Sequence, residues 1–179
     1  TEIALISLSH IVVHNSIRVG GDKMDNDIIN YLRKKNNLHV GLLTAEKIKT
    51  TIGSAYPLKE ELTMEVRGRD IVSGFPVTIK ISSEEIREAL SETVSTIVDS
   101  IKRLFERTAP ELAADIAERG IYLTGGGALL KGLDEKISKT VDLPVYVVPD
   151  ALECVVKGAG KVLDDIDHYR EVLIKRIED

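Results

Sequence analysis

A run of three glycines carries the chemistry that is easiest to interpret in this sequence. Residues 121–132 read Ile-Tyr-Leu-Thr-Gly-Gly-Gly-Ala-Leu-Leu-Lys-Gly, so a short β-rich segment leads into Gly125, Gly126 and Gly127. Because glycine has no Cβ, three in succession let a backbone approach a flat or anionic ligand closely. Their N–H groups lead into the start of an apolar, helix-like segment, where partial positive charge collects. The pattern is typical of a nucleotide-binding turn, and a tight strand-to-helix turn without a ligand is the alternative.

Other kinds of chemistry have little support in the sequence. One cysteine, Cys154, excludes an internal disulfide, and its apolar neighbours predict a buried, inert thiol. The net charge of −5, with Lys and Arg interspersed among Asp and Glu, argues against nucleic acid as a partner. No apolar run approaches the ~20 residues of a membrane span. None of the histidines falls at a metal-ligand spacing; they are His10, His14, His39 and His168.

Alternating strands and helices must position the glycine turn. Apolar alternation and turn residues predict strands over residues 2–8, 11–19, 62–66, 75–81, 121–124 and 145–148. Helical spacing of apolar residues predicts helices over residues 22–35, 44–53, 83–107, 112–118, 133–139, 151–163 and 164–179. This order indicates an α/β domain with some antiparallel pairing, in which residues 62–81 form a hairpin-like interruption.

Several helix starts can be predicted from their capping residues. Asp22 and Thr44 are expected to be N-caps, and Ser82 with Glu85 three residues later has the spacing of a capping box. Gly158 and Gly160 fall inside the expected 151–163 helix, where each costs about 1 kcal/mol relative to alanine. We therefore expect close packing at these two glycines.

Six separated segments, in order, resemble the C-terminal half of MreB, the bacterial actin-like cytoskeletal family. The resemblance runs from residue 1 to about residue 166. The segments are Thr-Glu-Ile-Ala-Leu-Ile-Ser-Leu (1–8), Ser-Ile-Arg-Val-Gly-Gly-Asp (16–22), Thr-Ala-Glu-Lys-Ile-Lys (44–49), Pro-Glu-Leu (110–112), Leu-Thr-Gly-Gly-Gly-Ala (123–128) and Val-Lys-Gly-Ala-Gly (156–160).

This resemblance implies the second lobe of the actin/Hsp70/sugar-kinase ATPase fold. The fold class would be α/β, a ribonuclease-H-like lobe with a five-stranded mixed sheet, helices and a small inserted α+β subdomain. Residues 1–50 and 82–163 would form the inner subdomain, residues 51–81 the small outer subdomain, and residues 164–179 a C-terminal helical tail. The chain starts at Thr1, without an initiator Met, inside an expected strand. We therefore expect a piece of a longer protein.

The resemblance also assigns nucleotide-binding residues. Gly125, Gly126, Gly127 and Ala128 match the family's adenosine motif, in which the glycine backbone lies against the nucleotide. Glu46 and Lys49 match helix positions that face the ribose and the adenine, and a spacing of three places them on one helical face. Without the resemblance, these two residues would be interpreted as a solvated helix flank. No catalytic or metal-binding residue is assigned.

The implied function is that of an ATP-binding, filament-forming lobe of an MreB-like bacterial actin involved in cell-shape determination. The alternative is a lobe of another ATPase of the same superfold, of the chaperone or sugar-kinase type. The resemblance implies self-association into protofilaments, with a longitudinal contact from residues 51–81. It also implies inner-membrane morphogenesis proteins as partners, a membrane surface as a further candidate, and a cytoplasmic location.

The cofactor expected from the resemblance is ATP, with Mg²⁺ only in the complete two-lobe protein. The family's first lobe and its phosphate loops have no counterpart in these residues. We therefore expect weak or undetectable ATP binding by the chain alone, and no ATPase activity above background.

Overall fold

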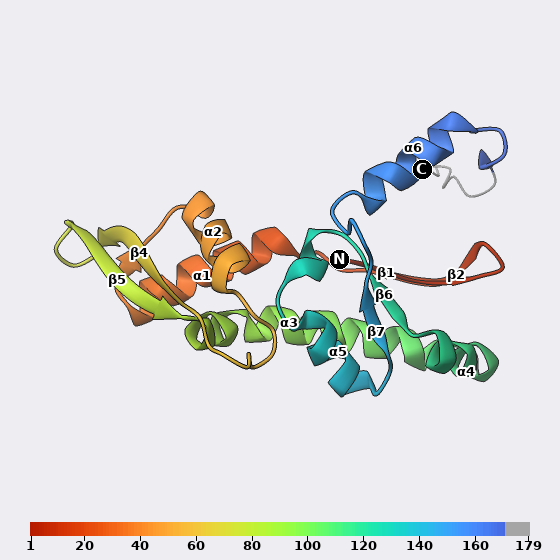
Figure 1. Ribbon diagram of the computed structural model, residues 1–179, viewed down its shortest axis with the longest axis horizontal. Coiled ribbons are helices and arrows are strands. Elements are labelled where there is room, and N and C mark those ends of the chain that lie inside the picture. The colour runs from red at the N-terminus through yellow and green to blue at the C-terminus, as the bar shows by residue number, and fades with distance from the viewer. Residues whose placement is uncertain (171–179) are drawn as a thin grey trace, which may run out of the picture.

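The computed structural model describes residues 1–170 as an elongated molecule built around one long helix (Figure 1). Its helices are α1 (Gly21–Lys35), α2 (Leu42–Ile52), α3 (Ser83–Glu106), α4 (Pro110–Arg119), α5 (Leu133–Val141) and α6 (Cys154–Asp164), with a short 3-10 helix, η1 (Gly126–Leu129). Its strands are β1 (Glu2–Ser7), β2 (His10–Ser16), β3 (Leu38–His39), β4 (Thr63–Asp70), β5 (Pro76–Ser82), β6 (Ile121–Leu123) and β7 (Val145–Val147).

The strands form three small sheets. β1 and β2 form an antiparallel pair, β6 and β7 form a parallel pair, and β3, β4 and β5 form an antiparallel sheet in that order. The predicted alternation of strands and helices is present. The described residues do not form a single five-stranded sheet, because no ladder joins the β1–β2 pair to the β6–β7 pair. The second predicted strand also stops at Ser16, so residues 17–19 add no further strand.

Strand β3 was not predicted, because two residues are too short to show a periodic pattern. It pairs with the end of β4 at Leu38↔Asp70 and His39↔Arg69. Gly68 makes this pairing possible, since a Cβ there would lie 2.7 Å from the carbonyl oxygen of His39. The small sheet therefore combines the predicted hairpin with residues that precede α2.

The turn of the β4–β5 hairpin is shorter than the sequence predicts. The predicted strands stop at residue 66 and resume at residue 75, but β4 continues to Asp70. The Asp70 carboxylate accepts hydrogen bonds from the backbone N–H groups of Ser73 at 2.7 Å and Val72 at 2.8 Å, which lower its pKa. Gly74, at φ +79°, completes the reversal. The aspartate thus fixes the turn from its first position.

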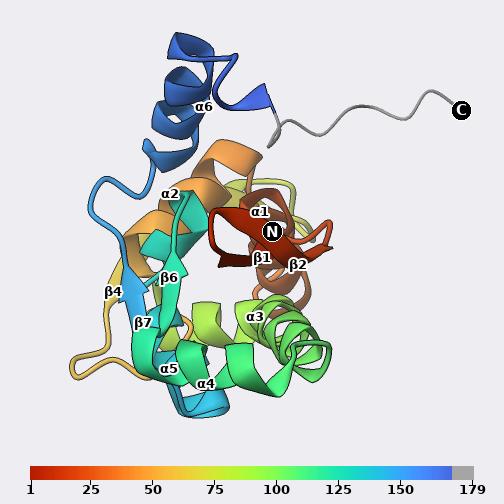
Figure 2. The ribbon, with the colours of Figure 1, turned by 90° about the vertical axis from the view of Figure 1, so that its right-hand side faces the viewer.

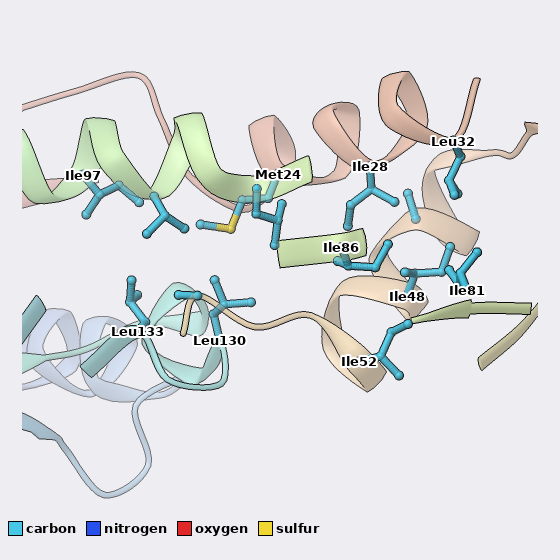
Figure 3. Close-up of a cluster of buried hydrophobic side chains, with 14 of the residues drawn as sticks. Met24, Ile28, Leu32, Ile48, Ile52, Ile81, Ile86, Ile97, Leu130 and Leu133 are labelled. Atoms are coloured by element: carbon cyan, nitrogen blue, oxygen red, sulfur yellow. The ribbon is translucent and has the colours of Figure 1, made fainter. Parts of the chain in front are cut away.

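The core is organised by the apolar stripe of α3. Ile86, Leu90, Val94 and Ile101 are all at most 5% exposed, as the helical spacing predicted. Figure 3 shows the side chains of α1, α2 and residues 130–133 converging on this helix. A helix of 24 residues spans about 36 Å, so α3 contacts both the small sheet, through β5, and α5, the helix that follows the glycine segment.

The predicted caps are confirmed at one helix and wrong at two. Ser82 accepts from the N–H of Glu85, and the Glu85 carboxylate accepts from the N–H of Ser82, so α3 begins with a capping box. Asp22 lies inside the first turn of α1, whose N-cap is Gly20. Thr44 lies inside α2, whose N-cap is Gly41. In both cases the helix begins earlier because a glycine adopts the extended cap conformation without a side-chain hydrogen bond.

Helix α6 extends away from the rest of the molecule, in blue in Figures 1 and 2. It contains no buried residue, and a Cβ on Gly158 or Gly160 would meet no atom within 4 Å. The expected close packing at these glycines is therefore wrong. The expected burial of Cys154 is also wrong, since Cys154 is half-buried.

The predicted tail helix is not present in the described residues. Residues 165–169 form turns, and residues 171–179 lie outside the described residues.

A polar network holds the loop between α2 and β4 against α3. The Arg87 guanidinium donates to the Glu61 carboxylate at 2.7 Å, to the Ser54 hydroxyl at 2.9 Å and to the Tyr56 carbonyl at 3.2 Å. The Ser83 hydroxyl also donates to Glu61. The bond from Arg87, then the one from Ser83, lowers the pKa of Glu61 to about 2 from its usual 4.5.

This pKa predicts an acid-dependent loss of stability. A carboxylate whose folded pKa is depressed stabilises the fold above its unfolded pKa, and this stabilisation is lost as the pH falls from about 4.5 to about 2. Urea unfolding at pH 6 and pH 3 will show that Glu61→Gln is less stable than the wild type at pH 6 and that the difference narrows at pH 3. The control is Glu60→Gln, at the neighbouring exposed carboxylate. A Glu61→Gln deficit that is the same at both pH values would contradict the assigned role of the ionised carboxylate.

Candidate functional site

The glycine turn connects β6 to η1, in the turquoise segment of Figure 1. Gly125 adopts φ +80° and ψ 173°, a conformation that is accessible to glycine and strained for any residue with a side chain. The next residue begins a four-residue 3-10 helix rather than a regular α-helix. The three glycines thus have different roles, because only Gly125 is required by the backbone conformation itself.

The backbone amides of the turn are divided between the protein and the solvent. The N–H of Gly125 donates to the carbonyl of Ala151 at 2.7 Å, and the N–H of Ala128 donates to the carbonyl of Gly125 at 3.2 Å. The first N–H groups of a helix have no intrahelical acceptor. Those of Gly126 and Gly127 also have no recorded partner outside η1 among the described residues. Two of the four amides in the predicted motif are therefore available to a ligand, whereas the other two hold the turn together.

The space around the turn differs from one glycine to the next. A Cβ on Gly126 would lie 3.2 Å from Cδ2 of Leu152, a side chain that is 67% exposed. A Cβ on Gly127 would meet no atom within 4 Å, so open space lies over this backbone. Ala128 is buried, at 6% exposure, and its side chain anchors the turn rather than facing a ligand. The backbone is therefore open at Gly125 and at Gly127, whereas the exposed side chain of Leu152 lies over Gly126.

The two residues predicted on α2 have different environments. Glu46 is exposed, and its carboxylate has no recorded hydrogen bond or ion pair among the described residues. Lys49 is half-buried, and its ammonium lies 2.9 Å from Oδ1 and 3.0 Å from Oδ2 of Asp25 on α1. It also donates to the carbonyl of Gly21 at 3.2 Å. Lys49 thus joins α2 to the start of α1, and much of its hydrogen-bonding capacity is used within the protein.

The structure joins α2 to the glycine segment through the residues that follow each of them. Among the described residues, Glu46 and Lys49 form no hydrogen bond or ion pair with the glycine turn. Instead, the N–H of Ala55 donates to the carbonyl of Lys131 at 2.8 Å. The Lys131 ammonium donates to the carbonyls of Thr50 and Thr51 at 3.0 and 2.8 Å. The predicted site residues are therefore on two elements that share one connection.

Asp25 and Lys131 were not predicted to support the site. Asp25 is 7% exposed and lies between Met24 and Ile28 on the buried face of α1. A carboxylate on such a face needs a cationic partner, and this signal could have identified the pair with Lys49. Lys131 offered no such signal, because its contacts depend on how two distant segments pack.

Within residues 1–170 no group of three or more His, Cys, Asp and Glu could hold a metal ion, and no helix is long and apolar enough to cross a membrane.

Comparison with known proteins places this geometry in a family. The family model described as MreB/Mbl protein matches residues 1–171. The cell shape-determining protein Mbl of Bacillus subtilis (strain 168) is 45% identical over 167 residues, 93% of this chain and 50% of that protein. The cell shape-determining protein MreB of Escherichia coli (strain K12) is 48% identical over 169 residues, 94% of this chain and 49% of that protein.

A solved structure extends the likeness to three dimensions. The crystal structure of MreB5 of Spiroplasma citri bound to AMPPNP matches with a TM-score of 0.89 at 42% sequence identity, over 95% of this chain and 51% of that one. The fold is therefore that of an actin-like α/β lobe, and the predicted fold class is confirmed. The chain belongs to the MreB/Mbl family. It spans about half the length of the curated relatives that it matches.

The pair of Lys49 and Asp25 predicts a specific loss of stability. The substitution Lys49→Met keeps most of the side-chain volume but leaves a nearly buried carboxylate without its cation, which costs about 2 kcal/mol of unfolding free energy. Chemical denaturation will measure this loss. The matched control is Lys47→Met on the exposed side of the same helix, where a change within about 0.5 kcal/mol is expected. Equal stabilities of the two variants would contradict a structural role for the pair.

Proposed function

We propose that this chain is the adenosine-binding lobe of an actin-like protein that acts in cell-shape determination. The observation that carries the proposal is the open space at Gly127, where a Cβ would meet no protein atom within 4 Å. The free N–H groups of Gly126 and Gly127 are suited to acceptor atoms of a nucleotide. The similar protein MreB5 of Spiroplasma citri has been crystallised with AMPPNP and with ADP.

In this proposal the residues around the turn have distinct tasks. Gly125 sets the backbone path, Gly126 and Gly127 lie against the nucleotide, and Ala128 anchors the turn in the protein. The exposed carboxylate of Glu46 accepts hydrogen bonds from the ribose hydroxyls. Lys49 lies near the purine but is held by Asp25, so its contribution is to place α2 as well as to supply positive charge. ATP fits these residues, and no Mg²⁺ ligand is assigned to them.

We further propose the division of the chain that the resemblance implies. Residues 1–50 and 82–163 would form the inner subdomain, and residues 51–81 the small outer one, with residues 164–179 as a tail. The position of the β4–β5 hairpin at one end of the molecule, away from β1, β2, β6 and β7, supports this division (Figure 1). The family match to cell shape-determining proteins disfavours the chaperone and sugar-kinase alternative.

Self-association into protofilaments is proposed for the same lobe. The tip of the outer hairpin exposes three apolar side chains, Ile71 at 44%, Val72 at 80% and Phe75 at 74%. Exposed apolar side chains gathered at one end of an elongated molecule are typical of an interaction surface. Inner-membrane morphogenesis proteins, a membrane surface and a cytoplasmic location are proposed from the family resemblance alone.

The nucleotide assignment can be tested by titrating the ¹⁵N-labelled chain with ADP and following amide chemical shifts. We expect shifts at residues 125–128 and at Glu46, with weak affinity and no ATPase activity above background. Gly127→Ala places a methyl group in the open space and should weaken binding about tenfold without lowering stability. Gly158→Ala, which also adds a methyl group into open space on α6, is the control. Equal affinity of wild type and Gly127→Ala would contradict the assignment.

The self-association proposal predicts an effect at the hairpin tip. The double variant Val72→Ser, Phe75→Ser removes exposed apolar surface and should lower the weight-average mass of the chain in concentration-dependent sedimentation. Leu8→Ser is the control, because Leu8 is 93% exposed on the β1–β2 turn, away from that hairpin. A double variant that associates as strongly as the wild type, or a larger effect of Leu8→Ser, would exclude the tip as the main contact.

A further inference from the structure

The proposed adenosine site depends on two elements whose proposed ligand-binding residues form no hydrogen bond or ion pair with each other in the described part of the chain. Gly126 and Gly127 are on the turn after β6, whereas Glu46 and Lys49 are on α2, about eighty residues earlier in the chain. A nucleotide held between them requires a fixed separation of the two elements. The residue that fixes this separation is therefore part of the site even if it never contacts the ligand.

Lys131 occupies the place where the two elements meet. Its ammonium donates to the last carbonyls of α2, those of Thr50 and Thr51, at 3.0 and 2.8 Å. Its own carbonyl accepts from the N–H of Ala55 at 2.8 Å, and its backbone forms a parallel bridge with Ser54. Both the side chain and the backbone of one residue thus hold the end of α2.

Further hydrogen bonds connect the residues around Lys131 to the proposed ligand-binding residues of both elements. On α2, the Thr50 hydroxyl donates to the carbonyl of Glu46 at 3.0 Å, within one helical turn. On the glycine side, the N–H of Leu130 donates to the carbonyl of Gly127 at 3.2 Å. Leu130 and Leu133 are buried in the core on either side of Lys131, so this segment cannot shift without repacking (Figure 3). A displacement at Lys131 is therefore transmitted to Gly127 and to Glu46.

The interaction is favourable for a physical reason that a neutral side chain cannot reproduce. The last carbonyls of a helix have no intrahelical donor and carry the negative end of the helix dipole. A cation at this position satisfies two carbonyls and interacts with the dipole. Gly132 follows at φ +69°, and a Cβ there would lie 2.9 Å from Cβ of Tyr56, so the two segments are already in close contact.

We infer that Lys131 is a positioning residue that sets the separation between the glycine turn and α2. This inference rests on the proposed adenosine site and names a residue that the site needs outside its contact surface. Lys131 acts through the carbonyls of Thr50 and Thr51 on one side and through its buried neighbour Leu130 on the other. As a consequence, local opening of one element is coupled to local opening of the other.

The inference is tested with the full chain carrying Lys131→Ala, Lys131→Arg or Lys139→Ala. Lys139 is an exposed lysine near the end of the following helix, α5, and serves as the matched control. Amide hydrogen exchange without nucleotide reports the coupling, and an ADP titration followed by amide shifts reports the affinity. For Lys131→Ala we expect faster exchange at residues 50–55 and 125–128 together and about fivefold weaker ADP binding. Lys131→Arg should restore both, since a guanidinium can donate to the same carbonyls, and Lys139→Ala should change neither.

Three results would overturn the inference. Faster exchange at residues 50–55 alone would mean that Lys131 only caps α2, and unchanged ADP affinity in a binding-competent chain would mean that the separation does not matter. Failure of Lys131→Arg to restore the ADP affinity would also count against positioning by a cation. Failure of the nucleotide assignment is a separate result: the wild type then shows no ADP shifts, while Lys131→Ala still raises exchange at both segments and the coupling stands.

Discussion

The packing of three elements against one face of α3 is the constraint on which the rest of this structure depends. Ile86, Leu90 and Val94 are buried along this helix, and α1, α2 and residues 130–133 pack against the same stripe. Burial of apolar surface stabilises a fold by roughly 25 cal/mol per Å², so this buried stripe stabilises the packing of all three elements. It also brings the glycine segment and α2 to a common place, although they are distant in sequence.

Polar contacts then fix what the apolar stripe brings together. Lys49 and Asp25 join α2 to α1, Arg87 holds the loop after α2 on α3, and Lys131 holds the end of α2 beside the glycine segment. Lys131 supplies donors to carbonyls near the end of α2, whereas Lys49 and Arg87 pair with the carboxylates of Asp25 and Glu61. The proposed nucleotide-binding backbone at Gly127 is exposed, whereas these polar contacts stabilise the fold. We therefore expect a substitution at Gly127 to leave stability unchanged and a substitution at Lys49 to lower it.

The sequence predicted the helices and the glycine turn well, because their signals are local and periodic. The stripe of α3, its capping box and the three glycines are all recognisable from residue types and spacing alone. Three of the failures share a cause, because they depend on whether distant segments are in contact. β3 exists because Gly68 lets two strands approach, Lys131 matters because two remote segments meet, and α6 is exposed although its sequence is apolar. Family resemblance gave Glu46 and Lys49, and the folded arrangement shows that Asp25, a carboxylate on the buried face of α1, pairs with Lys49.

The central claim is that the backbone of Gly126 and Gly127 is the surface against which adenosine lies. Transferred nuclear Overhauser effects between ADP and the protonated chain test it most directly, since they report proximity even when binding is weak. We predict contacts from the ribose and adenine protons to the Hα atoms of Gly126 and Gly127 and to the side chain of Leu152. Contacts confined to residues outside 121–132 and α2 would contradict the claim, because the nucleotide would then occupy a different surface of the lobe.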